Sequence, residues 1–268
     1  MKFRLLCVDL DGTLLTDDKE VSDEDISALR KAASQGIQIA LITGRMPAAV
    51  EGIVRQLAVP CIRACNAGTY ILDGEHCIHT EYLSVETMEA FYDRIRTFEI
   101  PFWIYREKQW FVTAKDRFVK EEEKRIDHRA ELVTVEDLAL QWRPKNTGPN
   151  KLLVGAQPQL VQKVHAQLKN HKDADMACSS PYFLEIFPSG MNKGRALQLI
   201  CDKMGIRREE TIAFGDQELD IPMLEAAGTA VAMGNAIEEL KGKADFITRT
   251  NNESGIAYAL KYYLYMKK

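Results

Sequence analysis

The sequence lacks several features that would place it in a specialised class of protein. Its 268 residues contain no apolar run close to the roughly 20 residues of a membrane span. The apolar stretch after Lys2 is interrupted by Arg4, so we expect neither a signal peptide nor contact with a membrane. The net charge of −4 provides no basic face, so nucleic acid is not an expected partner. What is present is ordinary globular composition, 46% hydrophobic and 28% charged.

The six cysteines lack the spacing of a metal or redox site. They stand at positions 7, 61, 65, 77, 178 and 201 and form no Cys-x-x-Cys pair. Several lie in apolar runs, as Cys7 does, which favours buried, reduced thiols in a cytoplasmic protein. The five histidines also show no metal-ligand spacing.

At both ends of the chain, the predicted strands and helices alternate. Short apolar runs at 3–8, 37–42 and 61–65 predict buried strands, and the stretches between them have the apolar spacing of helices. Helices and strands alternate again after residue 187. This alternation predicts an α/β fold with a parallel sheet and right-handed crossovers.

The middle of the chain follows a different pattern. From residue 83 a helix precedes a pair of strands, and the same order returns before residue 187. A helix followed by paired strands is typical of an antiparallel sheet covered by helices, which makes an α+β unit. We therefore predict a core domain of residues 1–82 and 187–268, with an α+β domain of residues 83–186 inserted between its halves.

Polar residues recur where the predicted parallel strands end. They are Asp9 and Asp11 after the first strand, Thr43 after the second and Asp216 after the strand at 212–214. Lys193 stands at the start of a helix, where backbone N–H groups help to bind an anion. Because ligand sites of open parallel sheets form at the carboxyl ends of strands, we expect these residues to share one site. Singly, each has an ordinary alternative role in a turn, strand end or helix cap.

These residue types together suit phosphoryl transfer. Carboxylates held close repel one another unless a cation lies between them, and oxygen ligands without His or Cys favour Mg²⁺. One carboxylate can attack phosphorus and give an aspartyl-phosphate, while a second moves the proton of the leaving group and of water. Lys193 and Thr43 offer a positive charge and a hydroxyl to the phosphoryl oxygens.

Four short motifs resemble those of the haloacid dehalogenase-like (HAD) phosphatase superfamily. In chain order they are Asp9-Leu10-Asp11-Gly12-Thr13, Thr43-Gly44-Arg45, Lys193-Gly194 and Gly215-Asp216-x-x-x-Asp220. The insertion between the second and third motifs is similar to that of Cof-type phosphatases with a large α/β (C2-type) cap. The resemblance implies a Rossmann-like core with a cap, and a magnesium-dependent phosphoric monoester hydrolase. It also implies small phosphorylated metabolites, sugar phosphates foremost, as substrates.

The resemblance also implies a role for each matching residue. Asp9 is the nucleophile and a Mg²⁺ ligand. Asp11 is the general acid and base, with its backbone carbonyl on the metal, and Asp216 is the third metal ligand. Thr43, Gly44 and Lys193 bind phosphate, and Asp220 orients water or Lys193. Gly12 allows a sharp turn after the two acids. For Asn66 and Arg45, a place at the substrate entrance and a structural role are both open.

One position departs from the pattern, and two other functions stay open. Cof-type relatives usually carry Asn where this chain has Leu219, and leucine cannot donate a hydrogen bond, so we expect weaker or altered phosphate binding. A phosphohexomutase of the phosphomannomutase type would use similar motifs and a similar cap. A non-catalytic phospholigand sensor is favoured only by Leu219. The sequence predicts no oligomeric state.

Overall fold

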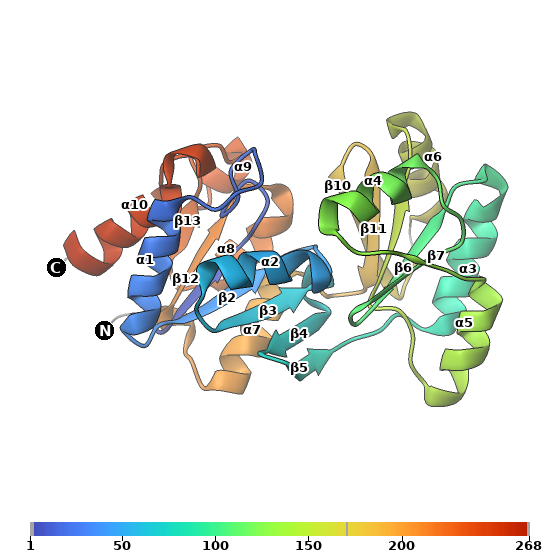
Figure 1. The fold of residues 1–268 in the computed structure, drawn as a ribbon, viewed down its shortest axis with the longest axis horizontal. Helices are drawn as coiled ribbons and strands as arrows, with labels where there is room; N and C mark the ends of the chain where they lie inside the picture. The colour runs from blue at the N-terminus through green and yellow to red at the C-terminus, as the bar shows by residue number, and fades with distance from the viewer. Residues whose placement is uncertain (1–2, 170, 267–268) are drawn as a thin grey trace. The chain divides into compact units, whose positions relative to one another are not determined.

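The computed structural model describes residues 3–169 and 171–266 (Figure 1). Residues 1–2, 170 and 267–268 of the predicted domains lie outside the described residues. The chain forms two compact units. Unit 1 comprises Met1–Gly44, Val50–His79 and Asn192–Lys268, and unit 2 comprises Arg45–Ala49 and Thr80–Met191.

Unit 1 contains a mostly parallel sheet in the order β14-β13-β12-β1-β2-β3-β4-β5. Its strands are β1 (Leu5–Val8), β2 (Gln38–Ile42), β3 (Cys61–Cys65), β4 (Tyr70–Asp73), β5 (His76–Thr80), β12 (Thr211–Gly215), β13 (Ala230–Ala232) and β14 (Phe246–Ile247). The strands from β14 to β3 pair in parallel, and β4 pairs antiparallel with β3. The predicted α/β fold with a parallel sheet is therefore confirmed, and β4 with β5 extends it beyond the prediction.

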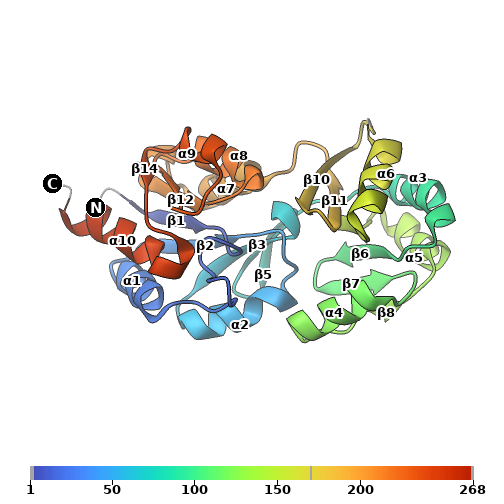
Figure 2. The same ribbon diagram turned by 90° about the horizontal axis from the view of Figure 1, so that it is seen from above.

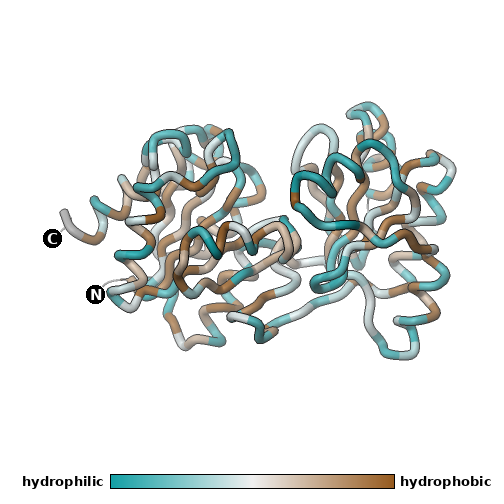
Figure 3. Tube along the Cα trace, in the orientation of Figure 1, coloured by the Kyte–Doolittle hydropathy of each residue, from teal (hydrophilic) through white to brown (hydrophobic). Residues whose placement is uncertain are grey.

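Helices cover both faces of this sheet, as Figure 2 shows: α1, α2 and α10 lie on one face and α7, α8 and α9 on the other. Their bounds are α1 (Asp23–Ser34), α2 (Ala48–Leu57), α7 (Lys193–Met204), α8 (Ile221–Ala226), α9 (Glu238–Lys241) and α10 (Gly255–Lys261). All four residues of β1 are buried, as expected for a parallel strand covered on both sides. Figure 3 shows the same separation, with the strands mostly brown and the outer loops mostly teal.

Local signals in the sequence set the ends of α1. The Ser22 hydroxyl accepts a hydrogen bond from the Asp25 backbone N–H at 3.2 Å, which satisfies one of the free amides of the first turn. The helix ends before Gly36, whose φ of +83° is readily available to glycine. The predicted helical spacing between the first two strands is confirmed by α1.

Unit 2 contains a second sheet in the order β10-β11-β9-β6-β7-β8. Its strands are β6 (Phe102–Arg106), β7 (Gln109–Val112), β8 (Glu131–Leu132), β9 (Lys151–Gly155), β10 (Ala174–Ser180) and β11 (Phe183–Pro188), and its helices are α3 (Val85–Ile95), α4 (Arg117–Ile126), α5 (Val135–Trp142) and α6 (Pro158–Leu168). The helices α3, α5 and α6 pack on one face and α4 on the other. The antiparallel pairs that β9 forms with β6 and β11 agree with the predicted α+β character.

Short turns join these elements. They are the 3-10 turns η1 (Asn66–Gly68), η2 (Arg96–Phe98), η3 (Arg143–Lys145), η4 (Arg208–Glu210), η5 (Glu218–Asp220) and η6 (Asn251–Glu253), and the π-helical η7 (Tyr262–Met266). Within the described ranges, no helix combines the length and the apolar character required to cross a membrane.

Candidate active site

Strand register brings three predicted site residues to one edge of the unit 1 sheet. Val8 of β1 is level with Leu41 of β2 and with Phe214 of β12. Asp9 therefore leaves β1 between the ends of β2 and β12, where Thr43 and Asp216 each come two residues further on. The Asp9 N–H donates to the Phe214 carbonyl at 3.1 Å, which ties the end of β1 to β12. This is the carboxyl edge, where open parallel sheets bind ligands.

A buried lysine joins two carboxylates at this edge. The Lys193 Nζ lies 2.6 Å from Asp9 Oδ1 and also forms an ion pair with Asp220 Oδ1. Lys193 is the first residue of α7, and the preceding Asn192 caps that helix by accepting from the Arg195 N–H. All three charged residues are buried. Two predicted site residues and one supporting residue thus meet in a single ion cluster.

Asp220 reaches this cluster through a tight turn. Its Oδ2 accepts from the backbone N–H groups of Asp216 at 2.9 Å and Gln217 at 3.0 Å. Asp220 therefore lies beside Asp216, four residues earlier in the chain. The segment is the 3-10 turn η5, in which the carboxylate folds back as a cap. Leu219 of the same turn is half-buried.

Asp216 is held by two side chains that the sequence reasoning did not single out. Its Oδ1 accepts from the Thr13 hydroxyl at 2.7 Å, and its Oδ2 accepts from Gln217 Nε2 at 3.1 Å. Gly12 has a φ of +85°, and a Cβ there would collide with the Asp216 carboxylate. The predicted sharp turn at Gly12 is confirmed, and the close approach gives a second reason for glycine.

Burial and repulsion raise the pKa values of the acids. Burial raises the pKa of Asp9 well above its usual range, and Asp220 and Asp216 add to this effect while Lys193 opposes it. Burial also raises the pKa of Asp216 to about 6, against the Thr13 hydrogen bond. Burial alone would lower the pKa of Lys193, but Asp220 and Asp9 outweigh it and raise that pKa. Close packing of these acids therefore disfavours the state in which all of them are ionised, unless a further cation balances them.

The donor set fits a divalent metal ion. Oxygen atoms of Asp9, Asp216 and Asp220 all lie within 4.8 Å of one another. Three carboxylates face one ammonium group, so a doubly charged cation would balance the fully ionised cluster. The donors are all oxygens, the type that Mg²⁺ prefers. Asp220 binds Lys193 through Oδ1 and two backbone amides through Oδ2, so both of its oxygens also have protein partners.

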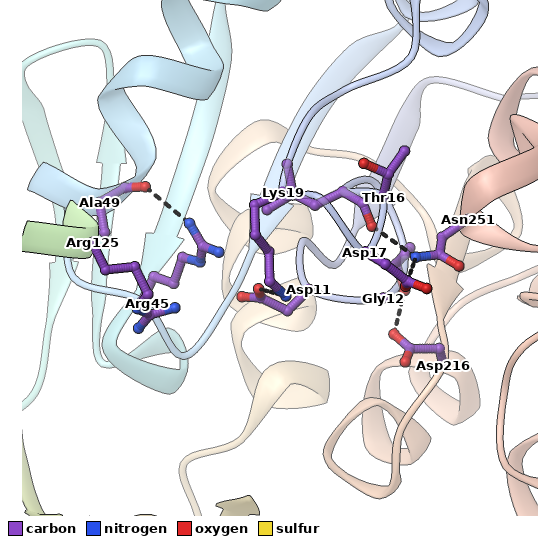
Figure 4. A network of polar contacts seen from close by, with 12 residues as sticks. Asp11, Gly12, Thr16, Asp17, Lys19, Arg45, Ala49, Arg125, Asp216 and Asn251 are labelled. Carbon is purple, nitrogen blue, oxygen red and sulfur yellow. Dashed lines mark hydrogen bonds and ion pairs between the residues drawn. The ribbon is translucent and has the colours of Figure 1, made fainter. Parts of the chain in front are cut away.

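Asp11 does not join the buried cluster. Its side chain is 40% exposed and forms an ion pair with Lys19, whose Nζ lies 3.0 Å from Asp11 Oδ1 (Figure 4). Sequence reasoning missed Lys19, because a surface lysine eight residues away carries no recognisable signal. Asp11 is therefore partly exposed on unit 1, two residues after the buried Asp9.

The loop after β1 is anchored by asparagines from distant parts of the chain. Asn251 Nδ2 donates to the Leu15 carbonyl at 3.0 Å and to Asp17 Oδ1 at 3.1 Å, and Figure 4 shows its approach to Asp17. Asn235 Nδ2 donates to the Gly12 carbonyl at 2.8 Å. These contacts join residues more than 200 positions apart, so spacing along the chain could not reveal them.

Thr43 and Gly44 lie at the same edge as the ion cluster. Thr43 is 2% exposed; its N–H donates to the Ala64 carbonyl, and its carbonyl accepts from the Ala67 N–H at 3.1 Å. The segment after β2 is therefore fixed to the end of β3. The structure brings Asp9, Asp216, Asp220 and Lys193 into contact, and places Thr43 and Gly44 at the adjacent strand end.

Comparison with known proteins agrees with this geometry. The model of a family described as haloacid dehalogenase-like hydrolase matches residues 6–260. The chain belongs to this family. It is 29% identical to the 5-amino-6-(5-phospho-D-ribitylamino)uracil phosphatase YwtE of Bacillus subtilis, over 95% of this chain and 96% of that protein.

Solved structures of HAD-like proteins share the fold. A haloacid dehalogenase-like hydrolase from Bacteroides thetaiotaomicron has a TM-score of 0.87 at 28% identity, over 98% of this chain and all of that one (100%). A HAD subclass IIB sugar phosphatase has a TM-score of 0.83 at 25% identity, over 97% of this chain and 98% of that one. The predicted membership and fold are confirmed, and the chain is a HAD-like phosphatase.

Proposed function

We propose that this HAD-like phosphatase hydrolyses small phosphomonoesters, with sugar phosphates as the leading class, through an aspartyl-phosphate on Asp9. The observation that carries the proposal is the buried Asp9–Lys193 contact of 2.6 Å beside Asp216 and Asp220. A carboxylate fixed by a lysine can attack phosphorus, and the same lysine can bind the phosphoryl oxygens. The names of similar proteins, a ribitylaminouracil phosphatase and a sugar phosphatase, support small phosphorylated metabolites as substrates.

The proposed reaction has two steps. An Asp9 oxygen bonds to phosphorus while the bond to the leaving oxygen breaks, and protonated Asp11 gives its proton to that oxygen. Ionised Asp11 then takes a proton from water, whose oxygen attacks phosphorus and releases inorganic phosphate and Asp9. Lys19, whose Nζ lies 3.0 Å from Asp11 Oδ1, would orient this carboxyl group.

Thr43, Gly44 and Lys193 are proposed to hold the phosphoryl oxygens during both steps. Asp220 keeps Lys193 in place, because its two oxygens bind the ammonium group and the η5 amides at the same time. Asp9 and Asp216, with the Asp11 carbonyl, would hold Mg²⁺. When bound, the ion would balance the excess negative charge and polarise the phosphoryl group.

We also propose roles for the two parts of the chain. Residues 1–82 and 187–268 form the catalytic core, since the Asp9–Lys193–Asp216–Asp220 cluster belongs to unit 1. Residues 83–186 form a cap that selects the leaving group, as expected for an inserted domain that closes over a site. The free cysteines of the described chain agree with a reducing, cytoplasmic location.

A screen of phosphorylated metabolites with and without Mg²⁺ tests the proposal. We expect magnesium-dependent release of phosphate that a chelator removes and added Mg²⁺ restores. The Asp9→Asn variant keeps the size of the side chain but loses the nucleophile, so its release of phosphate should be abolished. Undiminished turnover by this variant would refute the assignment of Asp9.

The same screen separates the other two functions. A hexose 1-phosphate incubated with its bisphosphate activator would accumulate as the 6-phosphate if the chain were a mutase. Tight binding of a phosphorylated compound without turnover in saturating Mg²⁺ would indicate a sensor. The proposal predicts free phosphate as the main product in both experiments.

A further inference from the structure

Asn66 has a buried side chain that makes no hydrogen bond to the described residues. The residue follows β3 at the carboxyl edge of the unit 1 sheet and is fully buried (0% exposed). Its backbone carbonyl accepts from the Thr69 hydroxyl at 2.8 Å. Neither the Nδ2 nor the Oδ1 of its side chain has a hydrogen-bond partner among the described residues. A buried carboxamide without partners is costly, so each such group needs an explanation.

Asn66 lies beside the proposed phosphate-binding residues. The next residue, Ala67, donates its N–H to the Thr43 carbonyl at 3.1 Å. The turn η1, which Asn66 opens, is in contact with α7, and Lys193 is the first residue of that helix. The turn that Asn66 opens therefore contacts both Thr43 and α7.

Other amide side chains at this edge are already occupied by protein partners. Gln217 donates to Asp216, and Asn235 donates to the Gly12 carbonyl. Asn192 caps α7 by accepting from the Arg195 N–H. Asn66 differs from these amides because its donor and its acceptor are both unused.

The backbone does not account for the choice of asparagine. Asn66 has a φ of +51°, a left-handed conformation in which asparagine is common. Ala67 adopts a similar conformation at a φ of +60° without any amide, and glycine would suit position 66 at lower cost. The carboxamide itself therefore needs a function.

We propose that Asn66 is a further substrate-binding residue of the phosphatase site. Its Nδ2 donates a hydrogen bond to a phosphoryl oxygen, and its Oδ1 accepts one from a hydroxyl of the same ligand. This inference rests on the proposed function, because the ligand is the phosphomonoester. It also supplies an amide donor to a site in which position 219 is leucine.

Binding of inorganic phosphate to the full-length protein in Mg²⁺, measured by calorimetry, tests this inference without turnover. Asn66→Gly keeps the backbone freedom and removes the amide. We expect phosphate affinity to fall about 10–100-fold, the effect of losing one hydrogen bond to a charged group. The melting temperature should stay equal or rise, because a buried unsatisfied group is removed. Asn66→Asp keeps the shape but adds a negative charge, so its loss of affinity should be larger.

Asn146→Gly is the matched control. Asn146 also adopts a left-handed conformation, with a φ of +50°, but it is exposed on unit 2. This variant should bind phosphate as the unchanged protein does. Unchanged phosphate affinity in Asn66→Gly, or a lower melting temperature as its only effect, would overturn the role of Asn66 and leave the phosphatase proposal standing. A protein with Asn66 in place that neither binds phosphate nor releases it from any substrate would refute both.

Discussion

Each unit of the molecule contains a buried lysine, but the number of carboxylates around the lysine differs between the two units. In unit 2, Lys151 pairs with Glu185 at 3.2 Å, and its Nζ lies 4.9 Å from the centre of the Tyr105 ring. In unit 1, Lys193 binds both Asp9 and Asp220, and Asp216 lies within the same carboxylate group. The first pair is balanced in charge, whereas the second cluster holds three carboxylates for one lysine.

This difference separates a structural ion pair from a reactive site. One ammonium and one carboxylate, supported by an aromatic ring, compensate each other and require no further ion. The unit 1 cluster, when fully ionised, has three carboxylates for one ammonium group, an excess that a divalent cation would balance. Burial of a lysine is therefore a weak sign of function, and the proportion of charges around it is the stronger sign.

The largest expected effect is on Lys193. Lys193→Met keeps the length of the side chain but removes the charge that binds Asp9 and the phosphoryl oxygens. We expect phosphate release to fall by about 10²–10³-fold or more, as for other removed transition-state donors. Steady-state kinetics on protein that circular dichroism shows to be folded would measure this. The Lys151→Met variant, assayed in the same way, should keep its turnover per folded molecule; equal losses in the two variants would erase the distinction.

The second prediction concerns the stability of unit 2. Lys151→Met leaves Glu185 buried without a partner, which should lower the free energy of unfolding by about 3–5 kcal/mol. Replacing both residues, as Lys151→Met with Glu185→Leu, should restore most of that loss because no buried charge is left. Urea unfolding of the three proteins measures both effects. A double variant as unstable as the single one would show that the pair itself is required.

Asp25 is a buried carboxyl without an ion-pair partner among the described residues. Asp25 of α1 accepts from the Ala257 N–H at 2.7 Å, and its Oδ2 has no partner among the described residues. Burial raises the pKa of Asp25 to about 6, although the hydrogen bonds from Ala257 and Ser22 oppose this. Without a neighbouring cation, this carboxyl is expected to be protonated where a paired one would be ionised.

Asp25 should therefore make stability depend on pH. Its pKa in the folded state lies above the unfolded value near 4, so the folded state binds the proton more tightly. Stability should fall as pH rises from about 4 to about 6 and change little above that, by at most about 3 kcal/mol in total. In Asp25→Asn this slope should vanish, and the variant should be the more stable protein at pH 7. Urea unfolding at several pH values in this range gives the free energy of unfolding of both proteins, and the difference between them isolates Asp25 from the other carboxyls. If the two free energies change with pH in parallel, the prediction is wrong.

The smallest expected effect is on the loop that presents Asp11. Asn251→Ala removes the hydrogen bonds to the Leu15 carbonyl and Asp17, so the loop should be held less firmly. We expect the turnover number to fall a few-fold, which corresponds to the net contribution of one hydrogen bond, about 0.5–1.5 kcal/mol. Phosphate affinity should change little. Asn252→Ala loses two exposed hydrogen bonds with Asp17 but none with the Leu15 carbonyl; it is the control and should change less. A fall in phosphate affinity with unchanged turnover would place Asn251 in binding instead.

Much of the fold was predictable because local signals agree with the tertiary structure. The apolar run predicted as a strand at 61–65 has the bounds of β3, because it ends at clear breakers. The elements β4 and β5 were missed because His76, His79 and Asp73 conceal the apolar pattern of this edge hairpin. The helix α5 was missed although Thr134 caps it by accepting from the Asp137 N–H, a signal that could have been used.

The site was predictable as far as its residues lie at strand ends. The first motif, Lys193 and Asp216 meet because parallel strands place their carboxyl ends at one edge. Lys19, Asn235 and Asn251 act through contacts set by loop conformation, which no spacing in the sequence encodes. The unused amide of Asn66 is visible only once burial and hydrogen bonds are known.

The central claim, covalent catalysis by Asp9, is tested most directly by trapping the phosphorylated enzyme. Acid quenching during turnover, followed by peptide mass spectrometry, should find a phosphoryl group on the peptide that contains Asp9. The label should be removed by hydroxylamine, as expected for an acyl phosphate, and should be absent from Asp9→Asn. Turnover with no phosphorylated peptide, or a label on any other residue, would contradict the account.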